Sequence, residues 1–141
     1  MNKQKLEQLM IKHKVLKEFD DGWDSLLLEF LLEFDRFYEM GKEEGLELYI
    51  IQTKEKYAGL RLHWSWDVED GKEEKAMTII EKVNNKLNKK TNELEKISFD
   101  ICEHCGIAEG VYVNSDKNWM KSYCPQCHEF RTEIEMLRGR K

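Results

Sequence analysis

Four cysteines are the residues with the clearest chemistry in this sequence. Cys102, Cys105, Cys124 and Cys127 form two Cys-x2-Cys pairs that are separated by eighteen residues. Two residues between the members of a pair allow a tight turn to direct both sulfurs at one ion, and Gly106 suits the positive-φ position of such a turn. This spacing predicts that all four thiolates bind one Zn²⁺ ion.

Two disulfides or redox-active cysteine pairs are the alternative uses of these residues. A redox pair normally opens a helix within a βαβ unit, and the sequence shows no such unit. His104 and His128 adjoin the cysteines and could replace a ligand, although four thiolates already complete a tetrahedral site. Because such a site leaves no position for water, we expect a structural Zn²⁺ cofactor without hydrolytic chemistry.

The sequence from residue 46 to 66 predicts a β-hairpin. LELYIIQTKEK and LRLHWSW are rich in β-branched and aromatic residues, and Tyr57-Ala58-Gly59 separates them. With Ala58-Gly59 as a two-residue turn, Lys56 would face Arg61 across the hairpin. One face would then carry Gln52, Lys54, Lys56, Arg61, His63 and Ser65. The opposite face would carry Tyr49, Ile51, Thr53, Leu62, Trp64 and Trp66 and would pack on the core.

The polar face of this hairpin is the candidate binding site. Arginine can hold a phosphate with two hydrogen bonds, lysines neutralise its charge, and an aromatic ring can stack on a base. We expect this face to bind an anionic aromatic ligand such as a nucleotide. The candidate binding residues are Lys54, Lys56, Tyr57, Arg61 and His63 from the hairpin and Trp119 and Lys121 from the ribbon. The alternative is a solvated strand face whose cations pair with the many acids of residues 18–47.

Apolar residues at helical spacing predict three long helices that would position the hairpin. The first covers about residues 4–19. The second begins with Asp21 or Asp24 as its N-cap and carries the broad apolar face expected at the centre of the core. The third runs from about Ala76 to Ile97, and its centre, NNKLNKK, is polar enough that part of it could project from the body.

The residues around the cysteine pairs predict the last elements. VYVNSD and NWMKSY have the composition of two short strands of a zinc ribbon, and Phe130, Ile134 and Leu137 recur at helical spacing. The predicted fold is therefore α+β, with helices around a β-hairpin and a C-terminal zinc ribbon. Residues 1–98 would form the α+β body, and residues 99–141 would form the zinc ribbon and the C-terminal helix.

Composition limits the environment and the partners of the chain. Hydrophobic residues make up 40% of the 141 residues and charged residues 36%, as in globular proteins with one core. The sequence has neither an apolar run of about 20 residues nor a secretory signal at its start, so we expect a cytoplasmic protein that does not contact membranes. Residues 18–47 hold eleven acids against two bases, and His13 is expected at the surface of the first helix.

The hairpin and the cysteine pairs together resemble a known family. IIQTKEKYAGLRLHW, followed by ISFDICEHCG and NWMKSYCPQC, is similar to a widespread family of small uncharacterised bacterial and phage proteins. That family pairs a hairpin reading roughly Lys-Glu-Lys-Tyr/Phe-Gly-Gly-Leu-Arg with a four-cysteine zinc ribbon, which implies the fold but no established activity. The resemblance covers about residues 46–131 and includes Gly22-Trp23, and Ala58 departs from the family's first glycine. The matching positions are Lys54, Glu55, Lys56, Tyr57, Gly59, Leu60, Arg61, the four cysteines, Gly106 and Trp119.

Three functional hypotheses follow. The first is a non-enzymatic zinc-ribbon binding protein, of phage or mobile-element origin, that recognises a nucleotide-like or phosphorylated small molecule through the cationic hairpin. The alternative is a protein-interaction module that docks its acidic helix on a host protein as an inhibitor or adaptor. Nucleic-acid binding comes third, because residues 100–131 hold five acids against three bases. The sequence contains no Walker loop, dinucleotide fingerprint or nucleophile elbow, so we expect no enzymatic activity.

Overall fold

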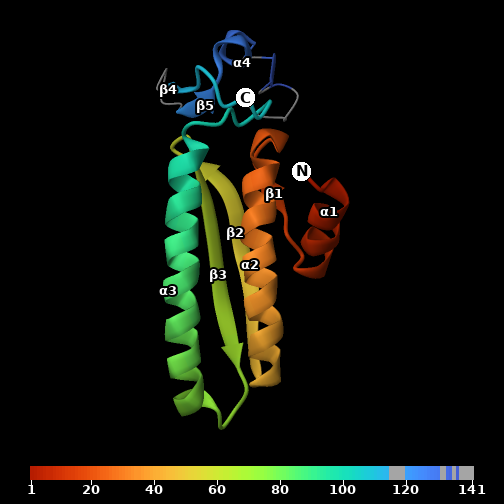
Figure 1. Cartoon of the computed structure of the whole chain (residues 1–141), viewed down its shortest axis with the longest axis vertical. Helices are drawn as coiled ribbons and strands as arrows, with labels where there is room; N and C mark the ends of the chain where they lie inside the picture. The colour runs from red at the N-terminus through yellow and green to blue at the C-terminus, as the bar shows by residue number, and fades with distance from the viewer. Residues whose placement is uncertain (115–119, 131–132, 135, 137–141) are drawn as a thin grey trace.

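The computed structural model of the chain describes residues 1–114, 120–130, 133, 134 and 136. It has a mixed α/β fold with a three-stranded sheet and a cysteine cluster near the C-terminus, which confirms the predicted fold class (Figure 1). The elements are α1 (Lys3–Lys12), β1 (Lys17–Glu18), η1 (Asp21–Trp23), α2 (Asp24–Glu43), β2 (Leu46–Lys56), β3 (Gly59–Val68), α3 (Glu73–Ser98), β4 (Tyr112–Asn114), β5 (Lys121–Tyr123) and α4 (Pro125–Glu129). None of the helices in the described part of the chain combines the length and apolar character that spanning a bilayer requires.

β2 and β3 form the predicted antiparallel hairpin, but its turn differs from the predicted one. Lys56 pairs with Gly59, so the two-residue turn is Tyr57-Ala58 and the prediction of Ala58-Gly59 is wrong by one position. Both turn residues have positive φ, 53° and 70°, as in a type I′ turn. The Glu55 carboxylate accepts a hydrogen bond from the Ala58 N–H at 2.9 Å, and Ala58 is fully buried. Tertiary contacts therefore select a turn that backbone propensity alone disfavours.

A β-bulge changes which residues of β2 face the core. The register shifts between Ile50 and Gln52, so the strand gains one residue relative to its partner. On the side of the bulge away from the turn, Leu48 and Ile50 pack with the core. Ile51 is 61% exposed and Tyr49 is 38% exposed. The predicted inward positions of Tyr49 and Ile51 are therefore wrong, because one inserted residue exchanges the two faces of a strand.

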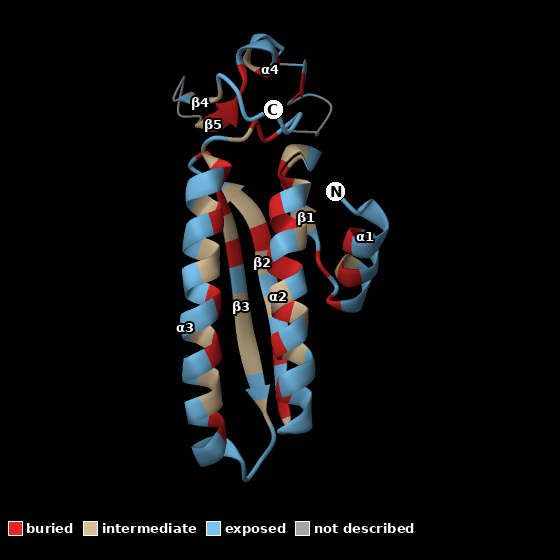
Figure 2. Cartoon of the chain, in the orientation of Figure 1, coloured by how far each residue is buried: buried red, intermediate tan, exposed pale blue. Residues whose placement is uncertain are grey.

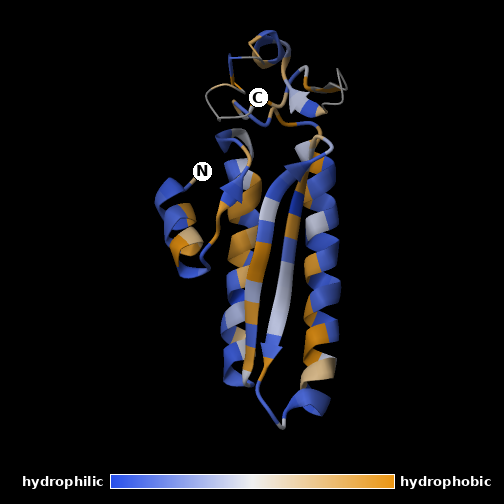
Figure 3. Cartoon of the chain, turned by 180° about the vertical axis from the view of Figure 1, so that it is seen from behind, coloured by the Kyte–Doolittle hydropathy of each residue, from blue (hydrophilic) through white to orange (hydrophobic). Residues whose placement is uncertain are grey.

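The two long helices, α2 and α3, cover one face of the hairpin (Figures 1 and 2). Seen from behind, the hairpin lies in front of both helices (Figure 3). The broad apolar stripe of α2 supplies Phe30 and Phe34, which are both fully buried, and Trp23 lies fully buried just before that helix. The main core comprises Leu6, Leu9, Val15, Phe19, Trp23, Leu26, Leu27, Phe30, Leu31, Phe34, Phe37, Leu48, Leu60, Leu62, Val83, Leu87 and Leu94.

The start of α2 differs from its predicted form. The residue at its N-cap position is Trp23, which is also the last residue of η1. Neither Asp21 nor Asp24 is therefore the N-cap. Lys17 instead forms ion pairs with both aspartates, and its ammonium lies 2.8 Å from the Asp24 carboxylate. The helix ends at Glu43, next to Gly45 at φ 75°.

The polar centre of α3 does not project from the body. Leu87 is fully buried at this centre. The indole N–H groups of Trp64 and Trp66 both donate to Asn84 Oδ1, each at 2.9 Å. Asn84, one of the asparagines that suggested a solvated segment, thus faces the hairpin, because it is the hydrogen-bonding partner of two partly buried indoles.

The N-terminal helix is shorter than predicted. α1 ends at Lys12, and Lys14 has a φ of 54°. The chain then runs parallel to β2, where Lys17 pairs with Thr53. Thr53 also donates a side-chain hydrogen bond to the Leu16 carbonyl at 3.1 Å. This edge pairing draws residues 15–19 out of the helix that their spacing predicted.

His13 is buried, against the prediction of a surface position. Its side chain is 2% exposed and lies against the rings of Phe34 and Tyr38, with Nε2 2.8 Å from the Asp35 carboxylate. Burial lowers the pKa of His13 below its ordinary value of 6.5, against the opposing effect of Asp35. α1 is therefore held on α2 by a histidine that resists protonation.

The protein should lose stability on mild acidification because of His13. The unfolded chain binds a proton on His13 more readily than the folded chain does, so this stabilisation is complete above pH 6.5 and declines as pH falls below it. Urea unfolding at pH 7.5 and 5.5 should show a smaller loss of unfolding free energy for His13→Gln than for the wild type. His63→Gln, at an exposed position, should behave like the wild type. Equal losses in all three proteins would contradict this role.

Candidate functional site

The four cysteines converge on one point beside the end of α3. Their sulfur atoms all lie within 4.8 Å of one another, and Cys105 Sγ and Cys124 Sγ are 3.7 Å apart. Sulfurs around a tetrahedral zinc ion, each about 2.3 Å from it, lie about 3.8 Å from each other. All four are free cysteines, so the disulfide alternative does not describe this structure. The cluster is a metal site in its geometry and in its ligand chemistry.

Local backbone structure forms both halves of this site. The Gly106 N–H donates to the Cys102 carbonyl at 2.9 Å, and Gly106 has a φ of 84°, which confirms its predicted role. In the second half, α4 begins directly after Cys124, and the His128 N–H donates to the Cys124 carbonyl at 2.9 Å. Strands β4 and β5 pair between the two halves, as the ribbon prediction requires.

The thiols differ in their pKa values when no ion is bound. Burial would raise the pKa of Cys124, but hydrogen bonds from the Cys127 backbone and the neighbouring thiols lower it to about 7. Burial raises the pKa of Cys105 and, more strongly, that of Cys127. Four such groups in contact favour a divalent cation, because a cation lets all of them bind as thiolates. His104 is directed elsewhere, since its Nδ1 lies 3.0 Å from the Asp20 carboxylate.

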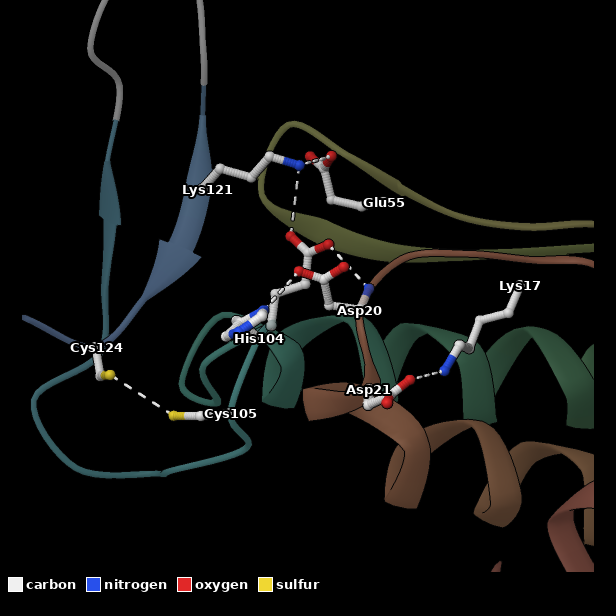
Figure 4. A network of polar contacts seen from close by, with 9 residues as sticks. Lys17, Asp20, Asp21, Glu55, His104, Cys105, Lys121 and Cys124 are labelled. Atoms are coloured by element: carbon white, nitrogen blue, oxygen red, sulfur yellow. Dashed lines mark hydrogen bonds and ion pairs between the residues drawn. The ribbon is translucent and has the colours of Figure 1, made fainter. Parts of the chain in front are cut away.

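Lys121 of β5 joins the ribbon to the hairpin turn (Figure 4). Its ammonium lies 2.6 Å from the Glu55 carboxylate and 3.5 Å from that of Glu103. The side chains of Lys121, Glu55 and Glu103 are 1%, 10% and 0% exposed, respectively. We call this ion-paired group of three residues the clasp. Lys121 was predicted to bind a ligand. It is instead buried between two carboxylates, where it links the ribbon to the hairpin.

Backbone contacts extend the clasp on both sides. The Ser122 hydroxyl donates to the Ala58 carbonyl at 2.7 Å, while the Glu103 N–H donates to the Ser122 carbonyl at 2.8 Å. The Gly22 N–H donates to the Glu103 carbonyl at 2.8 Å, and the Trp23 indole donates to the Ile101 carbonyl at 2.9 Å. The hairpin turn, the first cysteine pair and the start of α2 are therefore tied together at one end of the body.

Gly22 is the position of closest approach between the body and the ribbon. A Cβ at residue 22 would lie 2.1 Å from the Cys102 carbonyl oxygen and 2.4 Å from that of Glu103. Both obstacles are backbone atoms, so Gly22→Ala requires the ribbon to move. We expect this substitution to cost about 3 kcal/mol of unfolding free energy, which chemical denaturation can measure. Gly71→Ala is the comparison, because a Cβ there meets no atom within 4 Å, and its φ of +89° alone should cost about 1–2 kcal/mol.

The hairpin motif also packs against the end of α3. A Cβ at Gly59 would lie 2.8 Å from the Phe99 ring, so only glycine fits there without displacing that ring. The Leu60 N–H donates to the buried Ser98 hydroxyl at 3.0 Å. Gly59 and Leu60 thus make structural contacts between the hairpin and the end of α3.

The predicted ligand residues do not form one cluster. Lys56 and Tyr57 are exposed at the turn, where the ammonium lies 5.4 Å from the ring centre. Lys54 is partly buried in β2, and Trp119 falls outside the described residues. Arg61 and His63 instead line a groove between β3 and α3, which we call the β3–α3 groove.

The β3–α3 groove has a volume of about 380 Å³, within the usual size range of ligand pockets. Its lining comprises Leu60, Arg61, Leu62, His63, Trp64, Asn84, Asn88, Thr91, Asn92 and Glu95. Arg61 Nη2 lies 3.3 Å from the Glu95 carboxylate. Arg61 Nε is buried and has no hydrogen-bond partner in the described part of the chain. In the alternative reading the hairpin cations would pair with the acidic second helix, whereas Arg61 pairs with Glu95 of α3.

The groove was not predicted from the sequence, although a signal for it existed. Asn84, Asn88 and Asn92 follow one another at intervals of four residues and therefore share one face of a helix. As a polar run, this stretch favours a segment that could in part project from the body. A polar stripe that is directed at a strand is indistinguishable from a solvated one until the packing of the helix is known.

Comparisons of the chain with models of protein families, with curated proteins and with solved structures found no match.

Proposed function

We propose that this chain is a non-enzymatic binding protein that holds a polar ligand in the β3–α3 groove and uses a structural Zn²⁺ ion to fix its ribbon on the hairpin turn. The observation that carries this proposal is the groove itself, which is lined by three asparagines and by Arg61, whose buried Nε has no acceptor among the described residues. Buried donors are rarely left without a partner, so this one favours an external acceptor.

Zinc is the metal that the cysteine cluster supports best. Four thiolates at tetrahedral spacing form a closed site, which is the usual arrangement of structural zinc. The ribbon contacts the hairpin through the clasp and through the hydrogen bond from Ser122 to the Ala58 carbonyl, next to the start of β3. The ion therefore supports binding indirectly, by fixing the position of β3 beside α3.

The chemistry of the groove supports binding rather than catalysis. Its titratable side chains are Arg61, His63 and Glu95, and Arg61 and Glu95 are paired with each other. Catalysis usually needs a nucleophile beside a base or two carboxylates with different roles. The lining offers carboxamides instead, and each of these supplies both donors and an acceptor.

The charge of the groove favours a ligand of low net charge. Glu95 offsets the positive charge of Arg61, so a phosphate would gain little there unless it displaced Glu95. A nucleotide-like ligand could still bind through its base, since asparagine carboxamides complement base edges. The phage or mobile-element origin, the cytoplasmic location and the family resemblance stay predictions from the sequence.

The acidic surface of α2 supports the alternative function less well. Its carboxylates are largely engaged within the molecule, as Asp35 contacts Lys12 at 2.7 Å and Glu29 contacts Lys90 at 3.0 Å. Asp24 is likewise paired with Lys17. These contacts reduce the charge that α2 would offer to a partner protein.

The proposal is tested by binding measurements on the zinc-loaded full chain. Isothermal calorimetry and NMR shift mapping would use three sets of probes, namely nucleosides with their monophosphates, neutral sugars, and a displayed library of random peptides. Binding of one class should weaken in the double variant Asn88→Ala, Asn92→Ala, both at exposed positions of the groove. Asn85→Ala, an exposed asparagine of α3 that does not line the groove, is the matched control. If no class binds in a groove-dependent way, the proposal fails.

A further inference from the structure

We infer that the occupant of the β3–α3 groove is an extended peptide segment of a partner protein, which adds as a strand to the edge of β3. This inference rests on the proposed function, because it names the ligand class of the same groove. Its recognition would come mainly from main-chain hydrogen bonds, as in other proteins that bind a peptide at a sheet edge. Three features of the groove point to a peptide.

The first feature is the outer edge of β3. The three-stranded sheet has the order β1-β2-β3, so β3 is its terminal strand. A two-residue turn places a hydrogen-bonded pair at Lys56 and Gly59, and the direction of backbone groups alternates along an antiparallel strand. The backbone groups of Leu60 and Leu62 therefore point away from β2. The Leu60 N–H donates to Ser98 of α3, so an added strand would pair with β3 from Leu62 onward.

The second feature is the spacing of the asparagines on α3. Residues 84, 88 and 92 rise by about 6 Å per step along a helix. Two residues of an extended strand rise by about 6.6 to 6.8 Å. Successive carboxamides would therefore meet alternate peptide units of a strand lying in the groove. Asn84 Oδ1 accepts hydrogen bonds from two indoles. Asn88 and Asn92 line the groove and are exposed.

The third feature is the donor of Arg61. Its Nε is buried and without a partner in the described residues, while its Nη2 is held by Glu95. A peptide carbonyl is an uncharged acceptor that could satisfy Nε without separating this ion pair. A phosphate would compete with the Glu95 carboxylate for the same guanidinium. The peptide backbone therefore fits the charge of the groove better than a phosphorylated small molecule does.

The probe for this inference is a displayed library of random twelve-residue peptides, selected on the zinc-loaded full chain. Enriched peptides should bind about tenfold more weakly to the Asn88→Ala, Asn92→Ala double variant, since two hydrogen bonds are removed. They should bind Asn85→Ala as they bind the wild type. Hydrogen exchange of the Leu62 amide should slow when the peptide binds, because a new strand would cover that edge.

Backbone N-methylation separates strand addition from side-chain recognition. An enriched peptide would be synthesised twice, with N-methyl groups at even or at odd positions. Only alternate N–H groups of an added strand face β3, so one version should lose binding at least tenfold and the other should lose much less. Equal affinities of both versions, or unchanged exchange of the Leu62 amide, would overturn strand addition.

The outcomes also separate this inference from the proposed function. Groove-dependent binding of nucleosides or sugars, with no groove-dependent peptide, would overturn the peptide inference and leave the binding function intact. A lack of binding by every class would overturn both. Peptides that bind equally to the wild type and to the double variant would show that the peptide site lies elsewhere, and would also overturn the inference.

Discussion

Replacing Cys102 and Cys124 together by serine is expected to abolish tight metal binding and to unfold the ribbon while the helical body keeps its structure. The ribbon has its own small core of Cys102, Tyr123, Cys124, Cys127 and Ile134, which includes three of the four cysteines. Without an ion, four crowded sulfurs and few apolar side chains remain to hold this segment. Structural zinc sites contribute on the order of 10 kcal/mol to folding, more than any other single feature of this ribbon can supply.

Three measurements check this prediction. Elemental analysis should find one zinc ion per wild-type chain and none in the double variant. Circular dichroism should show that most helix remains, and NMR should show lost dispersion for residues of β5 and α4. His104→Ala is the control, because His104 contacts Asp20 and should leave the metal content unchanged. Metal-free protein with an unchanged ribbon spectrum would contradict the structural role of the ion.

Lys121→Met is expected to cost about 3–5 kcal/mol of unfolding free energy, the second largest effect. The substitution removes the ammonium that lies between the Glu55 and Glu103 carboxylates and leaves both charges in the interior. A buried carboxylate that loses its partner must be protonated or exposed, and either change destabilises the fold. Urea denaturation of zinc-loaded protein measures this loss directly.

Lys56→Met is the matched control for this prediction. It makes the same chemical change at an exposed lysine beside the hairpin turn, where we expect a change of at most about 0.5 kcal/mol. Adding Glu55→Gln to Lys121→Met should recover part of the loss, because one of the two stranded charges disappears. A Lys121→Met protein within about 1 kcal/mol of the wild type would show that the clasp contributes little.

These two predictions are linked to the groove through the hairpin turn. Within the clasp, Lys121 is ion-paired with Glu55, and Glu55 accepts a hydrogen bond from the Ala58 N–H of the turn. The turn leads directly into β3. Loss of zinc or of the Lys121 ammonium should therefore also lower the affinity of the β3–α3 groove for its ligand. Asn88 and Asn92 on α3 should keep their structure in these variants, since that helix packs on the main core through Leu87 and Leu94.

The metal centre could be predicted from the sequence because its determinants are local. Each cysteine pair closes within four residues, and Gly106 adopts the positive φ that its position suggested. The three long helical segments and the hairpin were also visible as periodic patterns. Burial of one continuous apolar face stabilises such elements largely independently of their neighbours, so the pattern alone identifies them.

Only the tertiary structure decided how the hairpin is used. Its turn is set by contacts of Glu55, Ala58 and Gly59 with the ribbon and α3, and its bulge sends Ile51 outward. Lys121 and Arg61 look alike in the sequence as cations near an aromatic residue. One is buried between two carboxylates and the other lines a groove, because their ion-pair partners come from other elements, Glu55 of β2 for Lys121 and Glu95 of α3 for Arg61. The sequence by itself determined where a metal ion binds, since the ligands are neighbours in the chain. Packing decided which polar residues remain available to a partner, because burial and charge pairing depend on elements that meet only in the folded protein.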